Sequence, residues 1–248
     1  MIAIRGLKKR LGSKQVLNGV DLDIPTGKTV VVMGRSGTGK SVLLKHIIGL
    51  MGPDAGSIEV EGKNIVGLKE RELNEVRIRF GLLFQGGALF DSMTVGENVG
   101  LPLKEHTQLK DDEIRKRVEE RLDWVGLKSV EDTKPASLSG GMRKRVGLAR
   151  AIAMDPAYIL YDEPTTGLDP IMADVINRLI RSLQQRIGVT SIVVTHDLHS
   201  AYHVGDILAM LHEGRVVFTG TPDEARGTKD PLVRQFIEGS SEGPIKPI

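Results

Sequence analysis

The 248-residue sequence contains no cysteine, which excludes disulfide bonds, thiolate metal sites and cysteine nucleophiles. Aromatic residues make up only 4% of the chain, too few for a surface on which nucleic-acid bases would stack. The 34 Lys and Arg residues nearly balance the 32 Asp and Glu residues, so the basic excess of a general nucleic-acid binder is missing as well. We therefore expect no nucleic-acid partner.

Long apolar runs are also missing, because none approaches the ~20 residues that a membrane-spanning helix needs. Residues 1–10 lack the apolar core of a secretory signal. The sequence therefore predicts a soluble, cytosolic chain with one large domain or a domain with a sub-lobe. Hydrophobic residues form 40% of it, enough for a substantial core, and the 29 glycines indicate many tight loops.

Short apolar, β-branched runs are typical of strands that are buried on both faces of a parallel sheet. Such runs occupy residues 29–33, 81–84, 157–161 and 191–195. Shorter strand patterns occupy residues 2–7 and 22–24. Residues 207–211 and 216–218 flank a turn and predict a hairpin. Since helical patterns alternate with these strands, the fold class is predicted to be α/β.

The segment from about residue 86 to 155 differs from the rest because it is mainly helical. Residues 111–125 place four apolar side chains on one helical face, namely Ile114, Val118, Leu122 and Val125. Trp124, the only tryptophan, is predicted to lie in the core of the same region. A helical segment between two strands predicts a lobe inserted into a domain that spans residues 1–238. Residues 239–248, rich in Gly, Pro and Ser, predict a C-terminal tail or extended arm.

The strongest motif lies between the predicted strand 29–33 and a helical pattern over residues 42–50. It consists of Gly34, Arg35, Ser36, Gly37, Thr38, Gly39, Lys40 and Ser41. Its glycines let backbone N–H groups approach phosphate oxygens, and the helix start adds free amides. Lys40 is expected to reach the β- and γ-phosphates of ATP, and the Ser41 hydroxyl to bind Mg²⁺. The flanking strand and helix disfavour the alternative of a glycine-rich turn that matches by chance.

Two carboxylates, Asp162 and Glu163, end the predicted strand 157–161. Ligands of α/β folds gather at such strand ends. A phosphate-binding loop also needs groups that hold magnesium and orient water. We therefore expect Asp162 to hold Mg²⁺ and Glu163 to polarise the attacking water, although alone the pair is equally typical of a solvated strand end.

A second glycine-containing helix start occurs at residues 138–142, ahead of a helix predicted over 143–154. Ser139, Gly140 and Gly141 there are suited to receive another phosphate. One chain does not need two cradles for one γ-phosphate, so the motif favours a head-to-tail homodimer in which each copy completes the site of the other. A plain helix start remains the alternative.

Taken in order, these motifs resemble ABC-type ATPase subunits over about residues 2 to 225. The resemblance rests on GRSGTGKS, Phe84-Gln85, LSGGM, ILYDEP, Gly167-Leu168-Asp169 and Thr195-His196-Asp197. It implies a P-loop NTPase fold with a mostly parallel sheet, an N-terminal antiparallel β element and the inserted helical lobe. It also implies Mg²⁺-dependent ATP hydrolysis coupled to transport, with Glu163, Gln85 and His196 as catalytic residues.

The same resemblance implies individual roles. Gln85 would reach Mg²⁺ and the attacking water, Asp169 would lie at the dimer seam, and His196 would contact the γ-phosphate. The family usually places an aromatic ring against adenine, where this chain has residues 8–12 (KKRLG). Arg10 or Leu11 would therefore have to cover the base.

A narrower similarity is to the ATPase of MCE-type phospholipid transporters, the Mla (maintenance of lipid asymmetry) system. It is carried by residues 84–95, 97–99, 101–103 and 105–107, by LSGGM with Lys144-Arg145, and by the tail at 233–244. It implies phospholipid transport between membranes and a peripheral position on the cytoplasmic side of a bacterial inner membrane. The partners it implies are a multi-span permease, an MCE-domain lipid-binding protein and a small regulatory subunit.

Other members of the broad family remain alternatives. The ATPase of a solute importer is the nearest, because it differs only in cargo. ABC ATPases without a transport role are less favoured: the chain has one P-loop rather than two, and no sustained heptads separate Lys40 from Ser139.

Overall fold

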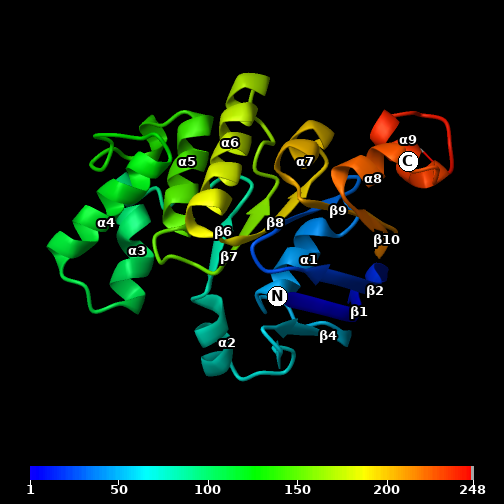
Figure 1. Ribbon diagram of the computed structural model, residues 1–248. Helices are drawn as coiled ribbons and strands as arrows, with labels where there is room; N and C mark the ends of the chain where they lie inside the picture. The colour runs from blue at the N-terminus through cyan, green and yellow to red at the C-terminus, as the bar shows by residue number, and fades with distance from the viewer. Residues whose placement is uncertain (247–248) are drawn as a thin grey trace. The chain divides into compact units, whose positions relative to one another are not determined.

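The computed structural model describes residues 1–246, which form two units (Figure 1). The first unit comprises Met1–Lys69 and the chain from Ile192 onwards, and the second comprises Glu70–Ser191. Among the described residues, no helix combines the length and the apolar character needed to cross a membrane.

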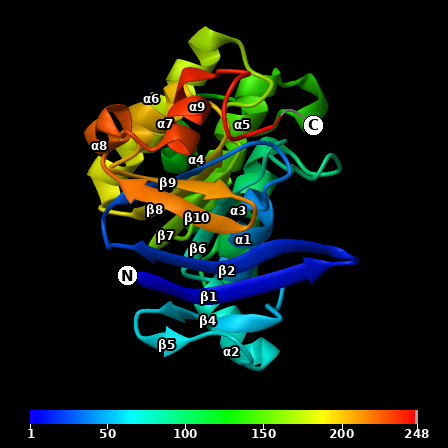
Figure 2. The same ribbon diagram turned by 90° about the vertical axis from the view of Figure 1, so that its right-hand side faces the viewer.

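The first unit begins with an antiparallel sheet, seen in Figure 2, that confirms the predicted N-terminal β element. Its order is β2-β1-β4-β5, with β1 (Ile2–Leu11), β2 (Lys14–Ile24), β4 (Ala55–Val60) and β5 (Lys63–Asn64). Ile2, Ile4 and Leu7 of β1 are fully buried. Both predicted strands extend further than their apolar patterns, because the exposed polar ends pair across the turn as far as Leu11 and Lys14.

The first unit also contains four strands in the order β10-β9-β3-β8. These are β3 (Thr29–Met33), β8 (Thr190–Thr195, whose first two residues belong to the second unit), β9 (Ile207–His212) and β10 (Arg215–Gly220). Strand β3 runs parallel to β9, with Val30 opposite Ile207, and every residue of β3 and β8 is buried. Strands β9 and β10 form the predicted antiparallel hairpin. The helices are α1 (Lys40–Ile47), α7 (Leu198–Val204), α8 (Pro222–Gly227) and α9 (Pro231–Glu238).

The second unit contains the parallel pair β6 (Phe80–Leu83) and β7 (Tyr158–Asp162). Its helices are α2 (Glu70–Arg77), α3 (Val95–His106), α4 (Asp111–Trp124), the 3₁₀ turn η1 (Pro135–Ser137), α5 (Gly140–Ala151) and α6 (Pro170–Ile187). Helices α3, α4 and α5 pack against one another (Figure 1). They lie between β6 and β7 in the chain, as expected for the inserted lobe.

The helical lobe is held by local capping and close packing. Thr94 and Glu97 form a capping box at the start of α3: the Glu97 N–H donates to Thr94 Oγ1, and the Thr94 N–H donates to Glu97 Oε2. A Cβ on Gly100 of α3 would lie 3.1 Å from Ile114 Cγ2 of α4, so the glycine lets the two helices pack closely. Trp124 differs from the prediction. It is half-buried between the guanidinium carbons of Arg121 and Arg186, 3.9 and 4.0 Å from its ring centroid.

Two predicted helices and the tail also differ from the sequence patterns. Helix α1 begins at Lys40 rather than residue 42, and α5 begins at Gly140 rather than 143. Residues 239–246 fold back onto α9 instead of extending, since Gln235 Nε2 donates to the Ile245 carbonyl (2.9 Å) and the Ile245 N–H donates to Gln235 Oε1 (2.6 Å). The last two tail residues lie outside the described chain.

Candidate functional site

The predicted phosphate-binding loop connects β3 to α1 in the first unit. A Cβ on Gly34 would lie 2.5 Å from the Leu211 carbonyl oxygen. Gly39 has a φ of 100°, and a Cβ there would lie 2.9 Å from Val16 Cγ1. Only glycine fits these two positions without a shift of the neighbours. The glycines therefore fix the loop against the fold, while Ser36 and Gly37 at its tip stay exposed.

Lys40 lies against the same loop and is only 5% exposed. Its Nζ donates to the carbonyl oxygens of Gly34 (2.8 Å) and Arg35 (3.1 Å). The Thr38 hydroxyl also donates to the Arg35 carbonyl, at 2.9 Å. A cavity of about 590 Å³ lies beside residues 35–38. A cation, exposed loop backbone and a helix start next to a cavity fit the phosphate groups of a nucleotide.

The two predicted carboxylates lie in the second unit, where β7 ends. Asp162 is half-buried and is the last residue of the strand. Glu163 is 8% exposed and has a φ of 49°, a left-handed conformation that costs free energy for a residue with a side chain. The Thr166 hydroxyl donates to Glu163 Oε2 at 3.1 Å. The Glu163 carboxylate is thus held by its own turn.

Lys144 of α5 contacts this turn, although sequence reasoning assigned it no role. It is 5% exposed, and its Nζ donates to the carbonyls of Pro164 (2.6 Å), Thr166 (2.7 Å) and Glu163 (3.3 Å). Burial lowers the pKa of Lys144 to about 8, and the Glu163 carboxylate opposes that change. One signal was available: Lys144 shares a helical face with Leu148, and both are buried.

Gln85 follows β6, also in the second unit, and is exposed. The residues after it are fixed by Arg150 of α5, which donates from Nη2 to the Gly87 carbonyl and from Nη1 to the Ala88 carbonyl, each at 2.9 Å. Burial lowers the pKa of Arg150. Sequence reasoning missed Arg150 too. Helix α5 therefore fixes the backbone of both loops that carry predicted catalytic residues of this unit.

The predicted second cradle forms the start of α5. Ser139 is the N-cap, and its hydroxyl accepts the Met142 N–H at 3.2 Å, so both following glycines lie in the first turn. Ser139 and Gly140 are exposed, whereas Gly141 is buried. The position of the cap explains why the helix begins earlier than its apolar pattern predicts.

The two remaining predicted residues also lie at element boundaries. Asp169 of the second unit caps α6, and its Oδ1 accepts the N–H groups of Ile171 and Met172, each at 3.0 Å. His196 of the first unit directly follows β8 and is exposed. The next residue, Asp197, caps α7.

The donor chemistry of the predicted metal-binding residues fits Mg²⁺. Within residues 1–246, no group of three or more His, Cys, Asp or Glu side chains that could hold a metal occurs. Magnesium is commonly bound through one or two carboxylates together with substrate phosphates and water. The Ser41 hydroxyl, the Asp162 carboxylate and the Gln85 amide all supply the hard oxygen donors that this ion prefers.

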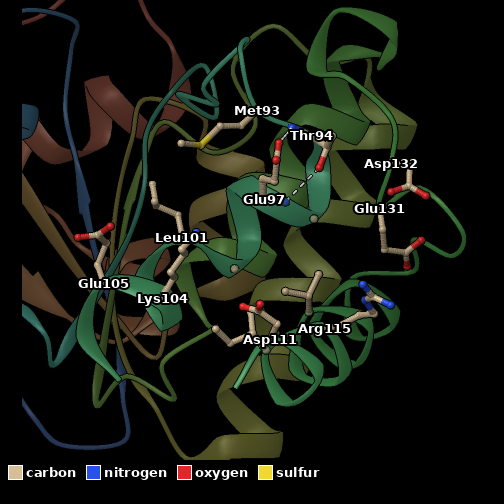
Figure 3. Close-up of a pocket in the computed structure, with 14 residues that line it drawn as sticks. Met93, Thr94, Glu97, Leu101, Lys104, Glu105, Asp111, Arg115, Glu131 and Asp132 are labelled. Carbon is tan, nitrogen blue, oxygen red and sulfur yellow. Dashed lines mark hydrogen bonds between the residues drawn. The ribbon is translucent and has the colours of Figure 1, made fainter. Parts of the chain in front are cut away.

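The second unit also carries two cavities of contrasting character. One of about 680 Å³ is lined by Phe84, Phe90 and Ile78, which are 39%, 51% and 40% exposed. The other, of about 440 Å³, lies between α3 and α4 and is shown in Figure 3. Charged side chains line it, including Lys104, Glu105, Asp111, Arg115, Glu131 and Asp132. The first cavity is therefore the more apolar of the two, although Arg77, Glu105 and Arg150 also line it.

Comparisons with known proteins agree with these motifs. The family described as ABC transporter matches residues 17–166. The chain is 46% identical over 244 residues to the probable ribonucleotide transport ATP-binding protein mkl of Mycobacterium leprae, covering 98% of this chain and 70% of the relative. It is 41% identical over 246 residues to the intermembrane phospholipid transport system ATP-binding protein MlaF of Haemophilus influenzae, covering 99% of this chain and 93% of the relative.

Solved structures of ATP-binding cassettes are similar to this chain in fold. One is a dimeric ATP-binding cassette in a post-hydrolysis state with ADP and Pi, at a TM-score of 0.83 and 34% identity, covering 90% of this chain and 99% of that one. Another is cbiO1 from Clostridium perfringens, part of the ABC transporter complex cbiONQ, at a TM-score of 0.83 and 30% identity, covering 94% of this chain and 93% of that one. The chain thus belongs to the ABC transporter family, as an ATP-binding subunit that hydrolyses ATP.

Proposed function

We propose that this ATPase powers the movement of phospholipid between membranes through a partner permease. The observation that carries the proposal is the 41% identity to MlaF of Haemophilus influenzae, which extends over 93% of that relative. A second candidate function is ribonucleotide transport, favoured by the 46% identity to a protein of that description. Both candidates share the same ATP-hydrolysing machinery and differ in cargo.

In the proposed reaction, the phosphates of ATP are bound by the loop from Gly34 to Ser41. Arg35, Ser36, Gly37, Thr38 and Gly39 contribute backbone, and Lys40 contributes positive charge. The exposed tip of the loop and the buried lysine beneath it support this role. Ser41, Asp162 and Gln85 would hold Mg²⁺, which when bound neutralises charge on the phosphate oxygens.

Glu163 acts in this proposal as the base that takes a proton from the attacking water. Its low exposure and its hydrogen bond from Thr166 support the role, because both restrict where the carboxylate can lie. His196 contacts the γ-phosphate, and its exposed position directly after a buried strand supports that assignment.

The active form is proposed to be a head-to-tail homodimer. Ser139, Gly140 and Gly141 of one copy face the nucleotide bound by the other, and Asp169 lies at the seam. The exposed N-terminus of the 12-residue helix α5 supports the cradle. The dimeric state of a similar cassette that holds ADP and Pi supports the assembly.

The proposed membrane partner is a multi-span permease that contacts the apolar cavity lined by Phe84 and Phe90. Exposed phenylalanines that line one cavity support a surface for a protein partner. The permease would attach the chain to the cytoplasmic side of a bacterial inner membrane. An MCE-domain lipid-binding protein and a small regulatory subunit complete the proposed assembly.

The experiment is affinity purification of the tagged chain from detergent-solubilised membranes, followed by mass spectrometry of proteins and lipids. We expect a permease and bound phospholipid. Substitution Phe84→Ser with Phe90→Ser should lose the permease and keep ATP binding, whereas Val217→Ser, at an exposed residue of β10, should keep both. A permease complex that binds ribonucleotides and no phospholipid would replace the first candidate by the second.

A further inference from the structure

We propose that Lys144 is a positioning residue for the Glu163 carboxylate, so that ATP turnover depends on a contact between α5 and the turn after β7. The inference rests on the proposed role of Glu163 as the base. It concerns residues of the second unit alone.

The contact is built from backbone acceptors. The Lys144 ammonium has three N–H donors, and the turn offers three carbonyls, those of Glu163, Pro164 and Thr166, at 3.3, 2.6 and 2.7 Å. Because the acceptors belong to the main chain, the lysine fixes the backbone of the turn rather than a side-chain rotamer of Glu163. The ammonium therefore sets the backbone position from which the Glu163 side chain extends.

The turn needs such support because its conformation is strained. Glu163 has a φ of 49°, which persists only where surrounding contacts enforce it. Inside the turn, the Thr166 N–H donates to the Glu163 carbonyl at 3.3 Å, and the Thr166 hydroxyl donates to Glu163 Oε2 at 3.1 Å. Lys144 contacts the carbonyls of both residues. Without the ammonium, the turn can relax toward an ordinary backbone conformation and carry the carboxylate away.

The cost of the arrangement argues for a role in function. Removing an ammonium from water is unfavourable, and the low pKa of Lys144, about 8, reflects that penalty. A methionine would fill similar space beside buried Leu148 without this desolvation penalty. The buried charge is therefore best explained by its hydrogen bonds to the turn that carries Glu163.

Helix α5 also links this contact to the second cradle. Ser139 caps the helix, and Lys144 lies in its second turn. A nucleotide held by a second copy and contacting Ser139 would therefore contact the same helix whose Lys144 holds the turn of Glu163.

The first test compares Lys144→Met and Lys144→Arg with Lys116→Met, a matched change at an exposed residue of α4. We expect Lys144→Met to lower kcat on the order of 100-fold, as for a misplaced reactive group. The KM for ATP and the affinity for ATP should stay within about 2-fold, since ground-state binding is untouched. Lys144→Arg should recover part of kcat, and Lys116→Met should change nothing. An unchanged kcat in Lys144→Met would overturn the proposal.

The second test is a double-mutant cycle with Glu163→Gln. If Lys144 acts through Glu163, Lys144→Met should cause no further loss of turnover in the Glu163→Gln background. The same fold-loss in both backgrounds would overturn the proposal. Full turnover by Glu163→Gln alone would instead refute the base itself, which is a failure of the proposed function. Should Lys144→Met not fold, Lys144→Gln takes its place in the cycle and is read by the same criteria.

Discussion

The buried ammonium of Lys144 predicts an unusual dependence of stability on pH. Its pKa is about 8 in the folded chain, against an ordinary value of 10.5 that applies after unfolding. Between these values the unfolded chain binds the proton and the folded chain does not. The free energy of unfolding must therefore rise with pH across this window. The stability gained at high pH is lost again as the pH falls toward 8.

The size of the effect follows from the same pKa values. Each pH unit between them is worth about 1.4 kcal/mol, so the whole window of about 2.5 pH units is worth at most about 3–4 kcal/mol. Other groups titrate in this range as well. The comparison should therefore be with Lys144→Arg, which keeps a charge at the same site throughout the window because the guanidinium stays protonated.

The assay is urea unfolding followed by the fluorescence of Trp124, the only tryptophan and a residue of the same unit as Lys144. The free energy of unfolding of the unmodified chain, minus that of Lys144→Arg, should grow as pH rises from about 8 to about 10. A difference that stays constant or shrinks with rising pH would refute the reasoning, because it would mean that the ammonium is not desolvated in the folded chain.

Three substitutions test the nucleotide site and the dimer. Lys40→Ala removes the cation beneath the phosphate loop and should weaken ATP binding measured by calorimetry; an unaltered Kd would count against the cradle. Gly39→Ala forces a side chain onto a φ of 100° and to 2.9 Å from Val16 Cγ1, so its thermal unfolding should show a loss of about 1–3 kcal/mol, and an unshifted Tm would contradict this. Ser139→Arg should block steady-state ATP turnover while isolated monomers still bind ATP; retained turnover would argue against a composite site.

The phosphate loop and the buried strands were predictable because their signals are local. Gly34 to Ser41 is a contiguous motif, and β3 occupies the residues of its apolar run. Gly34 is required by a close backbone contact with the Leu211 carbonyl, and Gly39 by its positive φ and its contact with the Val16 side chain. The place of Asp162 and Glu163 at the end of a strand was predicted in the same way, from polar residues that follow an apolar run.

The contacts of α5 were not predictable from local patterns. Lys144 reaches carbonyls 19 to 22 residues away in sequence, and Arg150 reaches carbonyls 62 and 63 residues away. Backbone acceptors have no residue identity, so the sequence does not show where a buried cation finds them. Trp124 illustrates the same limit, because an apolar-face argument does not anticipate two guanidinium groups stacking on its ring. Helix α2, which has no buried residue, was not predicted from the sequence.

The proposed dimer is tested most directly by analytical ultracentrifugation of Glu163→Gln with Mg²⁺, with and without ATP. This substitution should block hydrolysis and keep ATP in place. We predict that ATP converts the sedimenting species from one copy to two, and that adding Ser139→Arg abolishes the conversion. Persistence of a single copy at saturating ATP, both for the chain alone and for its complex with the permease, would contradict the account.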